Sequence, residues 1–147
     1  MSNTDPVEVF RVEAQELLER LEQGLLDLER TPDDGELVAS VFRALHTLKG
    51  SGAMFGFDAL ASFTHHCESA FDRVRKGLAK ATPALISAVL SALDHMRALA
   101  EGQETSKETG DRLLAAVRAA METEPRRRIS IPGRKTSFIR REIMKAA

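Results

Sequence analysis

The chain has 147 residues, of which 43% are hydrophobic and 29% are charged, enough for one domain with a buried core and a tail. Its single cysteine excludes a disulfide framework. Because it has neither a long apolar run nor a leader-like amino terminus, we expect a cytoplasmic protein without membrane insertion. The net charge of −1 is the sum of two opposite parts: residues 1–123 are acidic and residues 124–147 are basic. The acidic part argues against nucleic-acid binding.

Apolar residues recur at the three- and four-residue spacing of amphipathic helices along residues 6–121, and no segment alternates as a strand would. The first helix is expected to begin at Thr4-Asp5-Pro6, which supplies a cap and a first-turn proline, and to end before the break at residues 31–35. The other helices are expected over residues 36–54, from an Asp58 cap to Gly77-Leu78, from Thr82-Pro83 to a gap at residues 101–103, and, for a shorter fifth helix, after that gap.

These helices predict an all-α fold. Four amphipathic helices with short connections favour an antiparallel four-helix bundle, and the fifth helix is expected to pack against one end of the bundle or to extend beyond it. The composition changes at Glu124-Pro125, so we expect a domain over residues 1–123 and a basic linker or tail over residues 124–147. The positions expected to face the core in the third helix are Leu60, Phe63, Cys67, Phe71, Val74 and Leu78.

The most informative residue is His46, in the second expected helix. At about 100° per residue, it falls roughly 150° from the centre of the apolar face and therefore faces solvent. Lys49 lies on its flank and Gly50 beneath it. A glycine inside a helix costs about 1 kcal/mol relative to alanine, and outward-facing Gly50 has no packing reason, so we expect it to let the backbone of another protein approach. We interpret His46 as a phosphorylatable histidine.

The third expected helix supplies a candidate partner for this histidine. His65 and Glu68 share one side of that helix. A carboxylate that accepts the N–H of one imidazole nitrogen fixes the tautomer and makes the other nitrogen more nucleophilic. We expect Glu68 to do this for His46, Lys49 to pair with phosphoryl oxygens, and His65 to add a hydrogen bond. The plainer alternative is a Lys49–Glu68 surface ion pair worth under about 1 kcal/mol.

Residues near His46 form a candidate docking surface. Phe42 projects to the same flank as Lys49, where it either tucks under the first helix or contributes to a patch that a partner covers. The candidate partner-binding residues are Phe42, Arg43, Gly50 and Ala53.

These residues resemble the histidine phosphotransfer (HPt) domain, most closely the one at the amino terminus of CheA-type chemotaxis histidine kinases. The resemblance covers about residues 5–120 and rests on H-T-L-K-G-S-G at 46–52, F-G-F at 55–57 and F-T-H-H-C-E at 63–68. It implies that His46 is the phosphoacceptor, Lys49 the adjacent lysine and Gly50 the small residue of the motif. His65 and Glu68 match the supporting histidine and glutamate.

The resemblance also implies a division of labour within a two-component chemotaxis system. This domain would be the monomeric phosphotransfer part of a protein-histidine kinase, a transferase, and would hold no cofactor. ATP would bind to a separate kinase domain that phosphorylates His46 in cis or in trans. A CheY- or CheB-like response regulator, which holds Mg²⁺, would then receive the phosphoryl group on an aspartate. No P-loop is present, so we expect a fragment of a longer kinase.

Three other interpretations stay open: a stand-alone phosphorelay HPt protein, a helical docking module without phosphotransfer, and a metal site. The metal site would use His46, His65, His66 and Cys67. We expect no metal site there, because Cys67 lies on the core side of its helix and the side chains of the two adjacent histidines diverge by roughly 100°. The variant His46→Gln separates the carrier from the docking module, because only the carrier would lose its activity.

Overall fold

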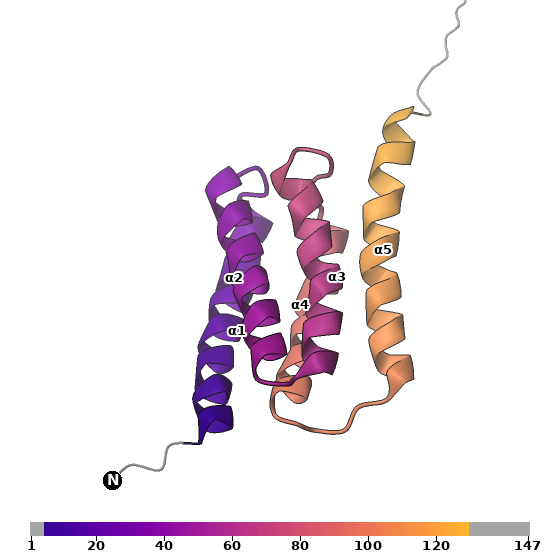
Figure 1. Cartoon of the computed structure of the whole chain (residues 1–147). Coiled ribbons are helices and arrows are strands. Elements are labelled where there is room, and N and C mark those ends of the chain that lie inside the picture. The colour runs from indigo at the N-terminus through magenta and orange to yellow at the C-terminus, as the bar shows by residue number, and fades with distance from the viewer. Residues whose placement is uncertain (1–4, 130–147) are drawn as a thin grey trace, which may run out of the picture.

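The computed structural model describes residues 5–129, with side chains as far as residue 122; the last part of the expected tail, residues 130–147, lies outside them. The described residues contain helices and no strand. Figure 1 shows the first four helices grouped as a bundle and the fifth beside it, which confirms the predicted all-α architecture. The helices are α1 (Pro6–Arg30), α2 (Gly35–Met54), α3 (Asp58–Arg75), α4 (Pro83–Ala100) and α5 (Lys107–Ile129).

Four of the helices begin at side-chain caps, and for α5 the hydroxyl of Ser106 accepts from the N–H of Thr109 at 3.1 Å. Asp5 accepts a hydrogen bond from the N–H of Val7 at 3.0 Å, and a proline opens α1 directly after it. At the start of α4, the hydroxyl of Thr82 accepts a hydrogen bond from the N–H of Leu85 at 3.1 Å. Asp34 caps α2. Because the first four N–H groups of a helix lack intrahelical partners, such caps fix where each helix starts.

The turn between α2 and α3 is tight, and its two phenylalanine rings pack against a ring of α1. Gly56 adopts a φ of 84°, and the N–H of Phe57 donates to the carbonyl of Gly52 at 2.7 Å. The ring of Phe10, on α1, lies 5.6 Å from that of Phe55 and 4.6 Å from that of Phe57. This arrangement turns α3 back along α2, and it places the middle of the two helices side by side.

The start of α3 differs from the prediction. Asp58 was expected to cap this helix, but it is the first helical residue, and Phe57 holds the cap position without a side-chain hydrogen bond. The ring of Phe57 packs into the aromatic cluster instead. The entry into α3 is therefore fixed by packing, and the carboxylate of Asp58 contributes only a favourable charge to the first turn.

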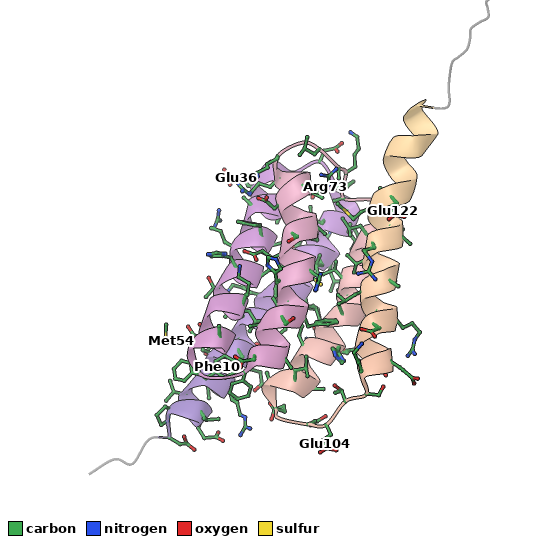
Figure 2. The ribbon with its side chains drawn as sticks, turned by 45° about the vertical axis from the view of Figure 1, so that its right-hand side comes forward. Phe10, Glu36, Met54, Arg73, Glu104 and Glu122 are labelled. Carbon is green, nitrogen blue, oxygen red and sulfur yellow. The ribbon has the colours of Figure 1, made fainter. Side chains whose placement is uncertain are left out.

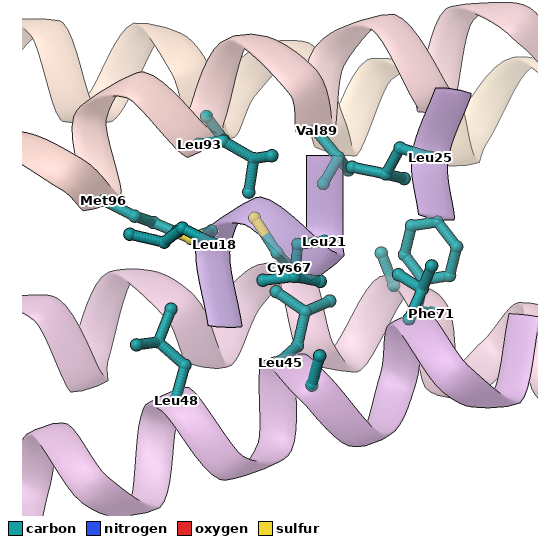
Figure 3. Packing of buried hydrophobic residues seen from close by; sticks show 14 of the residues in the cluster. Leu18, Leu21, Leu25, Leu45, Leu48, Cys67, Phe71, Val89, Leu93 and Met96 are labelled. Carbon is teal, nitrogen blue, oxygen red and sulfur yellow. The ribbon is translucent and has the colours of Figure 1, made fainter. Parts of the chain in front are cut away.

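The core lies between α1, α2, α3 and α4, where leucines of α1, α2 and α4 pack around Cys67 and Phe71 of α3 (Figure 3). Five of the six core positions predicted for α3 lie in or against this core. Leu78 is the exception, with 55% of its surface exposed. The prediction was wrong there because α3 ends at Arg75 and the chain turns at Gly77, whose φ is 78°.

Helix α5 differs from the prediction in length and in place. It has 23 residues, more than α2, α3 or α4, and it lies along α3 and α4 rather than at one end of the bundle (Figure 1). Its buried hydrophobic residues, as far as residue 122, are Val117 and Ala120. The helix continues past Glu124-Pro125 to Ile129, so the expected boundary coincides with no helix end. None of the described helices is both long and apolar enough to cross a membrane.

Candidate functional site

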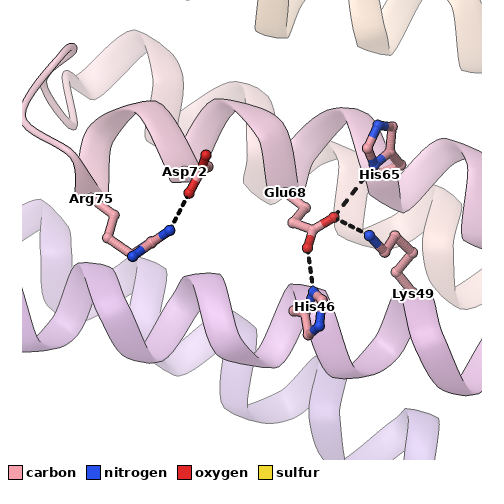
Figure 4. Close-up of polar contacts among 6 residues, drawn as sticks. All are labelled: His46, Lys49, His65, Glu68, Asp72 and Arg75. Carbon is pink, nitrogen blue, oxygen red and sulfur yellow. Dashed lines mark hydrogen bonds and ion pairs between the residues drawn. The ribbon is translucent and has the colours of Figure 1, made fainter.

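The imidazole of His46 projects from α2 toward solvent but is held at one nitrogen. Its side chain is 63% exposed, whereas that of Glu68, on α3, is only 8% exposed. Figure 4 shows the two side chains meeting between the helices, with Nδ1 of His46 2.5 Å from Oε2 of Glu68. Because an ionised carboxylate can only accept, Nδ1 carries the proton and donates it. The lone pair is then on Nε2, for which no described residue is a partner.

Glu68 connects the polar residues of the site. Its other oxygen, Oε1, lies 2.7 Å from Nζ of Lys49 and 3.4 Å from Nδ1 of His65. Burial alone would raise the pKa of this carboxyl, but the hydrogen bonds from Lys49 and His46 outweigh burial and hold the pKa below its usual value. Glu68 is therefore charged at neutral pH, as its role toward the imidazole requires.

The four residues predicted to carry the chemistry are thus brought together across one helix pair. Lys49 is 28% exposed, and its ammonium points to Glu68 rather than away from the bundle (Figure 4). His65 is 58% exposed and lies at the edge of the group. The spacing along each helix made their faces predictable, and the short turn at residues 55–57 sets the register between the helices.

Three of the four predicted docking residues are open to solvent near His46. Arg43 and Ala53 are exposed, and so is Gly50. A Cβ atom placed on Gly50 would meet nothing within 4 Å outside its own helix. No internal packing therefore requires a glycine at this position, as the sequence predicted.

Phe42 is in contact with side chains of both α2 and α3. It is half-buried and packs against the core. The guanidinium of Arg75 lies over its ring, with Cζ 4.4 Å from the ring centroid. The Phe42 ring also stacks on that of His46, with centroids 6.0 Å apart and planes 19° apart. Sequence reasoning missed Arg75, because no pattern within one helix indicates a contact between two helices.

The residues of the alternative metal site do not converge. His66 points away from His46 and lines a groove between α3 and α5. Cys67 is completely buried, and burial raises the pKa of its thiol to about 12. Within residues 5–122, no group of three or more His, Cys, Asp or Glu side chains is arranged as a metal site would require.

Comparison with known proteins matches this geometry to one family. Residues 6–100 match the profile of the Hpt domain. The chemotaxis protein CheA of Cereibacter sphaeroides is 38% identical over 112 residues, which cover 74% of this chain and 16% of that protein. The chain spans only 12% to 16% of the length of the first curated relatives it matches.

Two solved structures have the same fold. The CheA phosphotransferase domain from Thermotoga maritima is 34% identical, with a TM-score of 0.65, and the match covers 69% of this chain and 97% of that domain. The phosphorylated P1 domain of CheA3, solved in complex with CheY6 from R. sphaeroides, has a TM-score of 0.69 over 79% of this chain and 94% of that one. At 23% identity, this second likeness concerns the fold alone.

Proposed function

The chain belongs to the Hpt domain family, and we propose that it is the phosphoryl carrier of a CheA-type chemotaxis kinase, with His46 as the residue that carries the phosphoryl group. The pairing of an exposed imidazole with a buried carboxylate is the observation that supports this most. A histidine with one nitrogen held as a donor and the other open to solvent is suited to accept a group from outside.

The first transfer forms a bond between nitrogen and phosphorus. Nε2 of His46 attacks the γ-phosphorus of an ATP bound to the kinase domain, the bond to the bridging oxygen breaks, and ADP leaves. The imidazole gains positive charge during this attack. Glu68 stabilises that charge through the Nδ1 proton, which stays on the ring.

The second transfer releases the phosphoryl group. An aspartate oxygen of a CheY- or CheB-like regulator attacks the same phosphorus, the nitrogen–phosphorus bond breaks, and His46 returns to its neutral form. One structural neighbour is a P1 domain in complex with CheY6, which supports a regulator of this kind as the partner. The regulator, and not this domain, would hold the Mg²⁺ that neutralises the transferring group.

Lys49 and His65 have supporting roles in this proposal. Lys49 lies one turn from His46 and is partly exposed, so its ammonium can turn from Glu68 to the phosphoryl oxygens. Arg43, Gly50 and Ala53 surround the histidine as an open docking surface for the regulator and the kinase domain. The domain would thus be the substrate part of a histidine kinase, which acts in cis or in trans, and would not itself bind ATP.

A phosphotransfer assay tests the proposal. The chain, its His46→Gln variant and a His66→Gln variant are incubated with γ-labelled ATP and the ATP-binding domain of a CheA kinase. We expect acid-labile, base-stable label on the chain and on His66→Gln, and its transfer to an added CheY-type regulator. The absence of label with several kinase domains would favour a docking module. Label on His46→Gln would mean that another histidine is the acceptor.

A further inference from the structure

Three side chains from two helices form a row beside the phosphoacceptor. Arg75, at the end of α3, lies over the ring of Phe42, and that ring stacks on the imidazole of His46. Phe42 and His46 are four residues apart on α2, the spacing at which side chains on one helix face meet. The proposed chemistry uses the edge of the imidazole, through Nδ1 and Nε2, whereas the ring of Phe42 lies nearly parallel to it with centroids 6.0 Å apart.

The far end of this row is anchored by an acidic residue. The carboxylate of Asp72 accepts a hydrogen bond from Arg75 and also pairs with Nζ of Lys76 at 3.0 Å. Arg75 is the last residue of α3 and Lys76 follows it directly; Figure 4 shows the contact between Asp72 and Arg75. A guanidinium held in this way stays over the aromatic ring, with which it also makes a cation–π contact.

The bond to Glu68 leaves one motion of the imidazole unrestrained. A single hydrogen bond at Nδ1 fixes the position of that nitrogen, but the ring can still rotate about the bond, and this rotation moves Nε2. A neighbouring ring that lies nearly parallel, with its plane 19° from that of the imidazole, opposes the rotation.

We propose that Phe42 is a positioning residue for phosphoryl transfer: it holds the plane of the His46 imidazole, and Arg75, anchored by Asp72, holds Phe42. This inference rests on the proposed function of His46. It replaces the expectation that Phe42 is part of the docking surface, because a half-buried ring already in contact with two side chains offers little area to a partner.

Separate measurement of kcat and KM distinguishes a positioning role, which affects kcat, from a docking role, which affects KM. The chain serves as substrate for the ATP-binding domain of a CheA kinase, and the variants are Phe42→Leu, which removes the ring, and Phe42→Tyr, which keeps it. Releasing one restrained side chain typically changes such a rate by about 2- to 10-fold. We expect Phe42→Leu to lower kcat in this range with KM unchanged, and Phe42→Tyr to restore it.

Proton NMR of the His46 ring provides a readout that does not depend on any kinase. An aromatic ring at 6.0 Å shifts the resonances of the carbon-bound imidazole protons, so Phe42→Leu should move them and Phe42→Tyr should leave them nearly in place. If the wild-type chain accepts no phosphoryl group, the proposed function fails, while this measurement still tests the stacking itself.

Arg75 gives a second test that does not disturb the core, since its side chain is 41% exposed. Arg75→Gln should also lower kcat, but by a smaller factor than Phe42→Leu does. The matched control is Arg73→Gln, which makes the same charge change on the same helix beside α5 and should have no effect. A higher KM with unchanged kcat in Phe42→Leu would overturn the inference in favour of docking. Unchanged kinetics, or an equal loss in Phe42→Tyr, would also overturn it.

Discussion

Replacing Glu68 by glutamine separates the charge of this residue from its shape. The amide keeps the size of the side chain and one acceptor oxygen, but it removes the negative charge that faces Nδ1 of His46 at 2.5 Å. If the proposed chemistry holds, this charge matters most when the imidazole becomes positive during attack on phosphorus. Because Glu68 is only 8% exposed, solvent cannot replace the lost interaction.

The size of the effect follows from the kind of hydrogen bond that is lost. A hydrogen bond to a charged group contributes about 1.5–3 kcal/mol, which corresponds to a rate about 10- to 150-fold slower if it acts only in the transition state. We therefore expect Glu68→Gln to slow the phosphorylation of His46 by this factor. Binding of the chain to a CheY-type regulator should change much less, since Glu68 is buried and does not reach the surface that a partner touches.

Single-turnover phosphorylation and titration with the regulator measure these two quantities. The control is Glu104→Gln, which makes the same change in an exposed loop between α4 and α5. Phosphorylation of Glu68→Gln at the wild-type rate would refute the reasoning. Equal losses in rate and in regulator affinity would assign Glu68 to docking instead.

The same variant has a predicted pH dependence of stability. The pKa of Glu68 is lower in the folded protein than its usual value of 4.5, because hydrogen bonds from Lys49 and His46 outweigh the opposing effect of burial. A carboxyl with a lowered folded pKa contributes stability above its unfolded pKa and loses it as the pH falls through the folded one. The difference in unfolding free energy between wild type and Glu68→Gln should therefore be largest near neutral pH. It should shrink below about pH 4.5, as urea unfolding can measure.

Three further outcomes are expected. Gly50→Leu should stabilise the helix by about 0.8–1 kcal/mol, because a Cβ there meets no neighbour and leucine favours helices. The same variant should slow phosphoryl transfer to the regulator. Transfer at the full rate would remove the reason given for this glycine. Thr64→Val should raise the unfolding free energy by about 1 kcal/mol in urea titration, because the buried Thr64 hydroxyl has no hydrogen-bond partner. Burial lowers the pKa of His95. The contribution of this histidine to the unfolding free energy should therefore be intact at about pH 7.5. It should be lost as the pH falls below the pKa of the unfolded state toward the lowered pKa of the folded state. His95→Leu should unfold with less dependence on pH over this interval, and an unchanged dependence would contradict this.

The starts of α1 and α4 and the chemical face of the site could be predicted from the sequence because each depends on residues close together in the chain. Asp5 and Thr82 cap the helices that follow them, as expected from their residue types and the prolines beside them. The helical period placed His46 and Lys49 outward on one helix and Glu68 on the matching side of the next.

The contacts that could not be predicted depend on how helices lie against one another. The position of Arg75 over Phe42 depends on the lateral offset between α2 and α3, and helical periodicity carries no information on that offset. The length of α5 was missed for another reason. The apolar residues of α5 that pack against the bundle end at Met121, and a proline follows at position 125, so the pattern gave no sign that the helix continues to Ile129.

The geometry around Glu68 explains why the site has two histidines and a lysine around one carboxylate. In the structure, Lys49 and His65 both approach Oε1, at 2.7 and 3.4 Å, while His46 has Oε2 to itself. If Lys49 turns to the phosphoryl oxygens after transfer, Oε1 loses its charged partner while still mostly buried, which is costly for a carboxylate. His65 lies close enough to take that place. The phosphorylated and unphosphorylated forms would then both keep two donors on Glu68, so its carboxylate would stay in place and hold Nδ1 of His46 throughout the transfer cycle.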